Sequence, residues 1–548
     1  MTDLLRRWLD LALIAGVCVL LFFFRLGSFG LVGADEPRYA QVAREMLQRH
    51  DWVTPVLYGQ NWLEKPIAYY WGAMVSFKLF GISTATARVP SAFAASLMVL
   101  FIYFVLGRIR PAPRVDAALM VASSALILGM ARAASTDMVL SAPFAIAMLA
   151  WYAYESQAAA PSVLSPLWLI TANAALGVAT LAKGPVAPFL AVLILAGYAI
   201  LRRDYKVITR ALWIPGLLVF VLVAAPWYLM VQHRTPEFFR VFILEHNLGR
   251  FGSNLFRHRQ PFWYYVPVIL IATAPWTFFV ATALVTDLRD QWRACRDKVA
   301  AQDGFVQFLL LWTILPVAFF SVSQSKLPAY ILPSVPPALM LAADWIHRRS
   351  ACSERLPFWL AGFHAILLSS LAAVLLMTPA LILKLPAAPS ALMVGCLFGS
   401  VVFVAVVVSL LMRGWSMLRF ATLLPFVLYV SFVLRVLAPT LDATQSSRPV
   451  AALLGDERSL PVATFNVKRE VSYGLAFYLD RPPIPYTELE VSPHEYSIAA
   501  TIPRGEHVVV VREGSREPLR QVLPGRDIAL IGFLRAQHLE LFRVSAAH

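Results

Sequence analysis

Charged residues follow closely on the first apolar stretch of the chain. Residues 9–24 are apolar enough to enter a bilayer, and Asp35, Glu36 and Arg38 come soon after them. Ionisable side chains at a membrane surface are costly unless they face water, pair with one another or bind a ligand. Because many further apolar stretches follow, this pattern indicates chemistry at a membrane face rather than a simple anchor.

More ionisable residues stand in segments that are predicted to leave the membrane on the same, outer side. Lys and Arg are disfavoured in short outer loops, so those that occur there need another reason. Guanidinium and ammonium groups are the usual partners of phosphate, and this face is therefore predicted to hold an anion such as a phosphate. The residues concerned are Arg38, Glu64, Lys65, Arg132, Asp137, Lys183, His246, Arg250 and Lys326.

Two outer carboxylates, Asp35 and Asp137, lie at the predicted membrane edge. A carboxylate there can activate a nucleophile or position an acceptor, and neighbouring cations would stabilise a leaving phosphate. Asp35 could instead cap a helix that begins near Pro37. Arg38 could pair structurally with the acidic residues beside it.

Lys183 and His246 also have simpler explanations. Lys183 could snorkel from a helix end to the membrane surface. His246 and Glu64 could bind a divalent metal, but they lack tight ligand spacing, and a structural histidine is the alternative. The aromatic residues of the outer loops could stack on a sugar or form an interfacial belt.

The elements that must position these residues are helices. The chain has 548 residues, of which 59% are hydrophobic and 14% charged, which excludes a soluble globular protein. Its spans are continuously apolar, so helices rather than barrel strands are expected. We predict an all-α polytopic membrane protein of about 13 transmembrane helices, with spans near 9–26, 86–107, 116–131, 138–153, 165–181, 185–201, 212–231, 263–285, 305–322, 328–346, 357–377, 391–412 and 418–438.

Basic residues fix the predicted orientation. They gather in alternate connecting segments, which places the N-terminus in the cytoplasm and the C-terminus outside. The net charge of +15 follows from this topology and from acidic lipids, and the chain carries no nucleic-acid motif. The Val32-Gly33-Ala34 sequence resembles a signal-peptide cleavage site but lies too far beyond the apolar run, so an uncleaved first helix is predicted.

Two domains are predicted, a transmembrane domain at 1–440 and an outer α/β domain at 441–548. The first outer loop, about 27–85, should carry an amphipathic helix in the interface plane, since Pro37 suits a first turn and Tyr39, Val42 and Met46 recur at helical spacing. A second long outer loop covers about 232–262. In the tail, apolar runs at 462–465, 508–511 and 539–542 predict strands, and helices are predicted near 470–479 and 515–522.

Short motifs follow one another in order through the chain: Ala34-Asp35-Glu36-Pro37-Arg38-Tyr39, Glu64-Lys65-Pro66, Lys183-Gly184-Pro185, His246-Asn247-Leu248 and Lys326-Leu327-Pro328-Ala329-Tyr330. This set resembles the aminoarabinose transferase family. That family is a branch of the C-type glycosyltransferases, which use polyprenyl-phosphate sugars, and it is related to the protein O-mannosyltransferases. The resemblance implies a bacterial inner-membrane enzyme with the C-type glycosyltransferase fold and a periplasmic active site.

The resemblance also implies a reaction. A sugar, 4-amino-4-deoxy-L-arabinose, would move with inversion from undecaprenyl phosphate to a lipid A phosphate, which gives resistance to polymyxin. Asp35 would be the principal catalytic or acceptor-positioning carboxylate, and Asp137 would be the second acidic residue. Arg38, Tyr39, Lys65 and Arg250 would hold the donor phosphate, and Tyr330 would lie near the site mouth. No cofactor is required, a divalent metal at Glu64 or His246 stays open, and no obligate protein partner is expected.

Three alternatives remain at this point. The first is a polyprenyl-phosphate-dependent transferase that acts on another sugar and another acceptor, such as a glycan or a protein. The second is a flippase or transporter for a lipid-linked sugar, although transporters place their charges near the midplane and show internal repeats. The third is a membrane scaffold or sensor, which would leave the outer charges unexplained.

Overall fold

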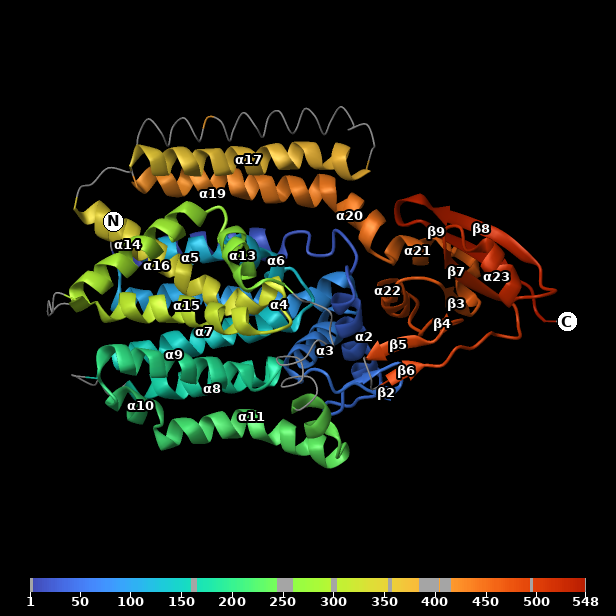
Figure 1. Cartoon of the computed structure of the whole chain (residues 1–548), viewed down its shortest axis with the longest axis horizontal. Helices are drawn as coiled ribbons and strands as arrows, with labels where there is room; N and C mark the ends of the chain where they lie inside the picture. The colour runs from blue at the N-terminus through green and yellow to red at the C-terminus, as the bar shows by residue number, and fades with distance from the viewer. Residues whose placement is uncertain are drawn as a thin grey trace.

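The computed structural model describes residues 3–158, 165–243, 260–296, 303–352, 357–383, 404, 415–492 and 496–547. Most helices run along the long axis of the molecule, and a small sheet unit lies at one end (Figure 1). The first of these helices are α1 (Asp3–Cys18), α2 (Asp35–Gln48), α3 (Ala68–Phe80), α4 (Thr84–Ile109), α5 (Arg114–Ala122), α6 (Ala125–Ala131), α7 (Thr136–Glu155), α8 (Ser165–Lys183), α9 (Val186–Arg202), α10 (Lys206–Ala211) and α11 (Ile214–Arg234).

The helical part continues with α13 (Tyr265–Ala272), α14 (Thr277–Arg296), α15 (Gly304–Val322), α16 (Val335–Ala351), α17 (Phe358–Leu383), α19 (Trp415–Phe432) and α20 (Ala438–Gln445). By length and composition, seven helices of the described residues can cross a membrane, or eight if one bent pair forms a single span. The protein is therefore a multi-pass membrane protein. The predicted count of thirteen is not confirmed, and the span at 391–412 lies almost wholly outside the described residues.

Two predicted spans are broken. The span at 116–131 consists of α5 and α6, which meet at 62°, and the span at 263–285 is divided between α13 and α14. The two breaks contact each other, because the Ala125 amide donates to the Ala274 carbonyl (2.8 Å), which pairs two backbone groups, and the Trp276 indole donates to the Ser123 hydroxyl (2.9 Å). Backbone groups freed inside a membrane must find partners in the protein. Distant segments provide them here.

The predicted helix in the first outer loop is α2. Its acidic first turn and Pro37 suit a helix start. The residues Tyr39, Val42, Ala43 and Met46 are buried in protein, and the orientation of the helix in the interface plane stays a prediction. They pack against α3 and against a helix of the C-terminal unit, so protein rather than lipid covers the apolar face.

The C-terminal unit confirms the predicted strands and helices. It comprises α21 (Arg448–Leu453), β3 (Val462–Phe465), α22 (Arg469–Leu479), β4 (Ile484–Pro485), β5 (Leu489–Ser492), β6 (Tyr496–Ile498), β7 (His507–Arg512), α23 (Arg516–Val522), β8 (Ile528–Leu534) and β9 (Leu539–Val544). The main sheet has the order β4-β3-β7-β9-β8, in which β3 is parallel to β4 and β7, and β9 is antiparallel to β7 and β8. A short hairpin in the first outer loop, β1 (Val56–Leu57) and β2 (Gln60–Asn61), stands apart from it.

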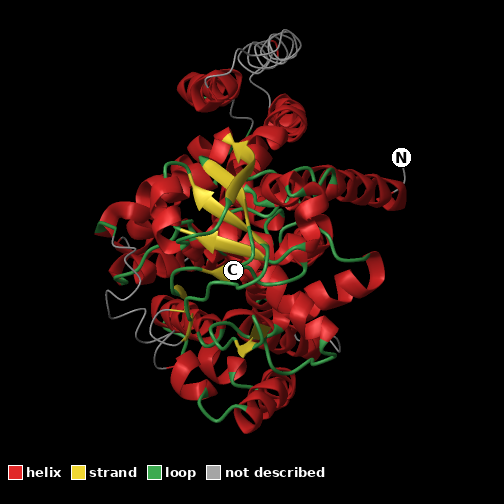
Figure 2. Ribbon diagram, turned by 90° about the vertical axis from the view of Figure 1, so that its right-hand side faces the viewer, coloured by secondary structure: helices red, strands yellow, loops and turns green. Residues whose placement is uncertain are grey.

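Alternation along the strands gives this sheet two apolar faces. Val508 and Val510 of β7 face the side covered by α21 and α22, whereas Val509 and Val511 face the side covered by α23. Figure 2 looks onto this unit, with its strands in front of the helical part. Because α2 and α3 lie between the sheet unit and the long helices (Figure 1), the first outer loop connects the two parts.

Candidate active site

Asp35 and Arg38 form the centre of the candidate site. They occupy the first turn of α2, where i,i+3 spacing brings their side chains together, and the Arg38 Nη2 lies 2.5 Å from the Asp35 Oδ1. The Asp35 side chain is 58% exposed, whereas that of Arg38 is 10% exposed. The site therefore presents a carboxylate to solvent and holds its cation behind it.

Carboxylates and aromatic rings surround the Arg38 guanidinium. Its Nη2 lies 4.0 Å from the Glu64 Oε2, and its central carbon lies 4.8 Å from the Trp62 ring centroid and 5.3 Å from that of Tyr39. Burial lowers the pKa of Arg38, but the charges of Asp35 and Glu64 outweigh this effect and hold the pKa above its ordinary range. The residue is thus a permanent, partly desolvated cation that suits an anionic ligand.

Tyr39 is a buried neutral phenol beside this cation. Its ring contacts those of Tyr69 (6.1 Å) and Tyr70 (6.3 Å). Burial, with the nearby Asp35 charge in second place, raises the pKa of Tyr39 well above its ordinary value. Tyr39 can therefore act as a hydrogen-bonding wall of the site and not as a base at neutral pH.

A second group of predicted residues comes together at the ends of α7 and α8. The ammonium of Lys183, the last residue of α8, pairs with the carboxylate of Asp137 in the first turn of α7. The Ser135 hydroxyl donates to the other oxygen of Asp137 (2.7 Å), and the Lys183 Nζ lies 5.1 Å from the Tyr330 ring centroid. Lys65, which is buried, is near enough for its charge to act on Asp137. The predicted pair of acidic residues is thus present, each with its own cation.

Arg132 and Lys326 are bound to backbone carbonyls instead. The Arg132 guanidinium donates to the carbonyls of Leu21, Phe24 and Arg25, at 2.9–3.2 Å. The Lys326 ammonium donates to the carbonyls of Ser323 (2.6 Å) and Gln260 (3.1 Å). These contacts give both buried cations a structural role. The predicted site residues His246 and Arg250 lie outside the described residues.

Glu36 differs from its neighbour Asp35. It forms a two-pronged ion pair with Arg88 of α4, at 2.7 and 3.0 Å, and it accepts hydrogen bonds from the amides of Val32 (2.8 Å) and Ala134 (2.7 Å). Arg88 is fully buried and also donates to the carbonyls of Leu26, Phe29 and Gly30. This network holds the first outer loop against α4 and the start of α7.

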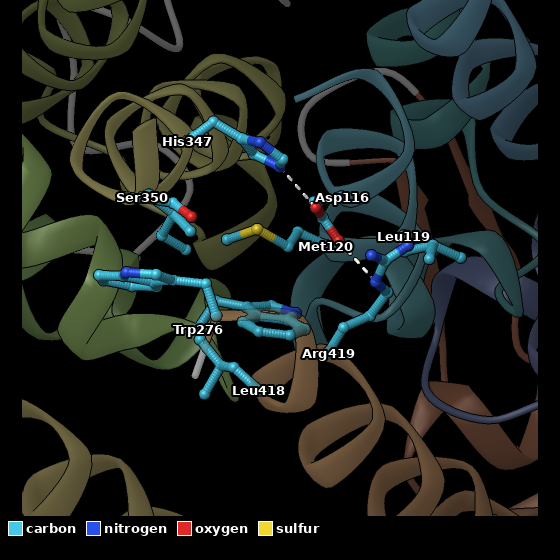
Figure 3. A pocket seen from close by; sticks show the side chains of 10 residues that line it. Asp116, Leu119, Met120, Trp276, His347, Ser350, Leu418 and Arg419 are labelled. Atoms are coloured by element: carbon cyan, nitrogen blue, oxygen red, sulfur yellow. Dashed lines mark hydrogen bonds and ion pairs between the residues drawn. The ribbon is translucent and has the colours of Figure 1, made fainter. Parts of the chain in front are cut away.

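Metal ligands do not gather in the described part of the chain, where no group of three or more His, Cys, Asp or Glu side chains could hold an ion. A pocket of about 160 Å³ lies elsewhere, between α5, α16 and α19. Figure 3 shows Asp116 between His347 and Arg419 at this pocket, with the nitrogens at 2.6 and 3.0 Å from the carboxylate. His347 is near the end of α16, whereas Tyr330 precedes its start, so the pocket is separate from the candidate site.

Sequence reasoning missed Tyr473, whose ring centroid lies 5.8 Å from the Arg38 guanidinium carbon. This residue belongs to α22 of the C-terminal unit. The tail carries no recognisable catalytic motif, so no signal in the sequence pointed to a residue there. The roles of Glu36 and Arg88 were also missed, because only the folded structure pairs the two residues.

Comparison with known proteins first defines a class. Residues 9–242 match the family model described as dolichyl-phosphate-mannose-protein mannosyltransferase. The fold matches the crystal structure of ArnT from Cupriavidus metallidurans bound to undecaprenyl phosphate, with a TM-score of 0.77 and 22% identity over 97% of both chains. The apo structure of that protein gives 0.74 and 22%, over 99% of this chain and 98% of that one. The chain thus has the C-type glycosyltransferase fold, as predicted.

Relatives in sequence are more specific. An undecaprenyl phosphate-alpha-4-amino-4-deoxy-L-arabinose arabinosyl transferase of Pseudomonas fluorescens Pf-5 is 33% identical over 359 residues, which are 65% of this chain and 59% of the relative. A transferase of the same name from Serratia proteamaculans is 34% identical over 336 residues, 60% of this chain and 58% of the relative. The matches therefore span less than two thirds of these relatives. The predicted resemblance is confirmed, since the chain is similar in sequence to aminoarabinose arabinosyl transferases.

Proposed function

We propose that this protein is an inverting glycosyltransferase that moves 4-amino-4-deoxy-L-arabinose from undecaprenyl phosphate to a phosphate of lipid A. The reaction would take place at the periplasmic face of the bacterial inner membrane and would give resistance to polymyxin and other cationic peptides. The observation that carries the proposal is the similarity to transferases of that name. The site agrees with it, because the Asp35–Arg38 pair lies on the predicted outer face.

The proposed reaction exchanges one phosphate for another at the anomeric carbon. An oxygen of the lipid A phosphate attacks this carbon, and the bond to the donor phosphate breaks with its electron pair left on undecaprenyl phosphate. The attacking phosphate is already ionised, so the site need not remove a proton. Asp35 would orient the acceptor or the amine of the sugar, since an exposed carboxylate can do either without acting as a strong base.

Stabilisation of the leaving phosphate would carry much of the rate. Arg38 is a buried, permanently charged cation at the centre of the site, and Lys65 adds a second buried cation. Preorganised charges of this kind act strongly on a group whose negative charge grows in the transition state. Tyr39 and Tyr330 would complete the binding surface, with Asp137 and Lys183 beside it.

A mass spectrum of lipid A tests the proposal. The host must make the aminoarabinose lipid donor but lack its own transferase. Expression of this chain should add one aminopentose to a lipid A phosphate, and Asp35→Asn and Lys65→Ala should abolish the adduct while the protein still accumulates in the membrane. An unmodified lipid A, with the protein present, would contradict the proposed sugar and acceptor. The family match to mannosyltransferases makes hexose donors the next to examine.

A further inference from the structure

Helix α22 of the C-terminal unit lies against α2, the helix that carries Asp35 and Arg38. Polar contacts hold the two helices together. The Arg44 guanidinium of α2 donates to the Phe477 carbonyl (2.6 Å) and pairs with Asp480 (2.7 Å), and the Gln48 amide donates to the same carboxylate (2.9 Å). The position of α22 on the candidate site is therefore specified by side chains of both partners.

The segment before α2 is tied to the same unit through Tyr478 and to the preceding helix α20 through Asp442. The amide of Gly30 donates to the Asp442 carboxylate and that of Leu31 to the Tyr478 hydroxyl, both at 2.7 Å. A Cβ on Gly30 would lie 1.9 Å from the Ser446 hydroxyl oxygen. This close approach requires glycine, so the first outer loop and the C-terminal unit fit closely at the edge of the site.

Tyr473 is the residue of α22 that reaches the Arg38 guanidinium. It is fully buried, its ring stacks on that of Tyr58 at 6.2 Å and 28°, and its ring centroid lies 5.8 Å from the Arg38 guanidinium carbon. Together with Trp62 and Tyr39, it surrounds the guanidinium with aromatic rings. These rings come from different parts of the chain, and one belongs to the C-terminal unit.

Positioning is what this arrangement supplies. An arginine side chain has several rotatable bonds, and its ion-pair partner Asp35 is mostly exposed, so the pair alone would leave the guanidinium plane free to turn. We propose that Tyr473 is a positioning residue that fixes this plane toward the phosphate of a polyprenyl-phosphate donor. By this inference the C-terminal unit completes the site. The identity of the anion rests on the proposed function.

The test uses the full-length protein with Tyr473→Phe, Tyr473→Leu and a matched control, Tyr478→Phe. Tyr478 stands on the same helix and in the same interface, but its hydroxyl contacts the Leu31 amide and Thr84 rather than Arg38. The measurements are kcat and KM for the lipid-linked sugar and, separately, the Kd for undecaprenyl phosphate alone. Thermal unfolding of each variant reports on folding.

We expect Tyr473→Leu to lower kcat/KM and to weaken undecaprenyl phosphate binding by about tenfold, the order of a desolvated cation–π contact. Tyr473→Phe keeps the ring and, like Tyr478→Phe, should stay within about twofold, since both substitutions leave the cation–π contact in place. In an Arg38→Lys background, Tyr473→Leu should have little further effect, because the residue acts through Arg38.

Each other outcome overturns the inference. Additive effects in the Arg38→Lys background would show that Tyr473 does not act through Arg38. An equal loss in the Tyr478→Phe control would show that only docking of the unit matters. Failure of the proposed function gives a different result. If the wild-type protein transfers no sugar but binds undecaprenyl phosphate, the Kd values of the variants still test the role of Tyr473. A wild-type protein that does not bind this lipid would refute both.

Discussion

Asp35 and Glu36 are adjacent carboxylates, and the structure predicts opposite consequences for their removal. The perturbation is the same in both cases, a carboxylate replaced by its amide, in Asp35→Asn and Glu36→Gln. Asp35 is 58% exposed and pairs with Arg38, whereas the Glu36 side chain is 9% exposed and pairs with the fully buried Arg88. The first substitution should therefore affect activity, and the second should affect folding.

The magnitude for Glu36 follows from its hydrogen bonds. One carboxylate oxygen accepts from the Arg88 Nε and the Ala134 amide, and the other accepts from the Arg88 Nη2 and the Val32 amide. In Glu36→Gln an NH₂ group must replace one of these oxygens. The two donors that bind that oxygen would then face another donor instead of an acceptor. Breaking a buried ion pair costs about 3–5 kcal/mol, a large share of the ~5–15 kcal/mol that stabilises a typical fold.

The magnitude for Asp35 is small in stability and large in activity. The Asp35 carboxylate is mostly exposed, and the buried Arg38 keeps Glu64 as a second carboxylate 4.0 Å away, so Asp35→Asn should unfold at nearly the wild-type temperature. If Asp35 orients a reacting group, its loss should lower kcat by about 10²-fold or more.

Two assays on the same purified proteins check both statements. Thermal unfolding in detergent should shift downward by on the order of 5 °C or more for Glu36→Gln, and sugar transfer should fail for Asp35→Asn in a protein of normal stability. A Glu36→Gln protein as stable as the wild type would refute the reasoning about the buried pair. An Asp35→Asn protein that transfers sugar at the normal rate would refute the assignment of the site.

Three further predictions concern other charged groups. Asp137→Asn and Lys183→Ala should each lower sugar transfer at least about tenfold, and the double variant should lose little more, since the two side chains form one ion pair; additive losses would contradict this. Arg132→Gln should destabilise the protein by about 2 kcal/mol or more without changing the KM for the donor, because its guanidinium binds backbone carbonyls; a raised KM would instead support phosphate binding. Burial lowers the pKa of His507 in the folded state, so the unfolded state binds more protons and stability should fall as the pH drops below about 6.5; hydrogen exchange in β7 should show this decline, and His507→Gln should remove it.

Local patterns predicted much of the fold. The apolar runs at 462–465 and 508–511 became β3 and β7, and the helical spacing after Pro37 became α2. The breaks in two spans were not predictable, because the hydrogen bonds that permit them join Ser123 to Trp276 and Ala125 to Ala274. The sequence of a long apolar run does not reveal whether its helix is broken, because the partners of the freed polar groups lie in a distant segment.

The candidate site was predicted by residue type but not by partner. Topology alone placed Asp137 and Lys183 near one face, and the structure pairs them. The predicted topology could not separate Asp35 from Glu36, since the difference between them arises from Arg88, which is on another helix. It could not find Tyr473, which meets Arg38 only because α22 docks on α2.

Five outer cations among the described residues divide into two kinds, and this division indicates which of them suit a phosphate. Arg88, Arg132 and Lys326 donate to backbone carbonyls, and a ligand that took these donors would leave buried carbonyls unsatisfied at a cost of roughly 1–3 kcal/mol each. Arg38 and Lys183 pair with carboxylates, and a phosphate can replace a carboxylate at a cation with little loss. At Arg38 the displaced carboxylate is the exposed Asp35, so binding of the donor phosphate would release the group that our proposal requires to orient the other substrate. Binding of the donor phosphate and release of the Asp35 carboxylate would then occur together. Glu36 cannot be released in this way, because its partner Arg88 is fully buried.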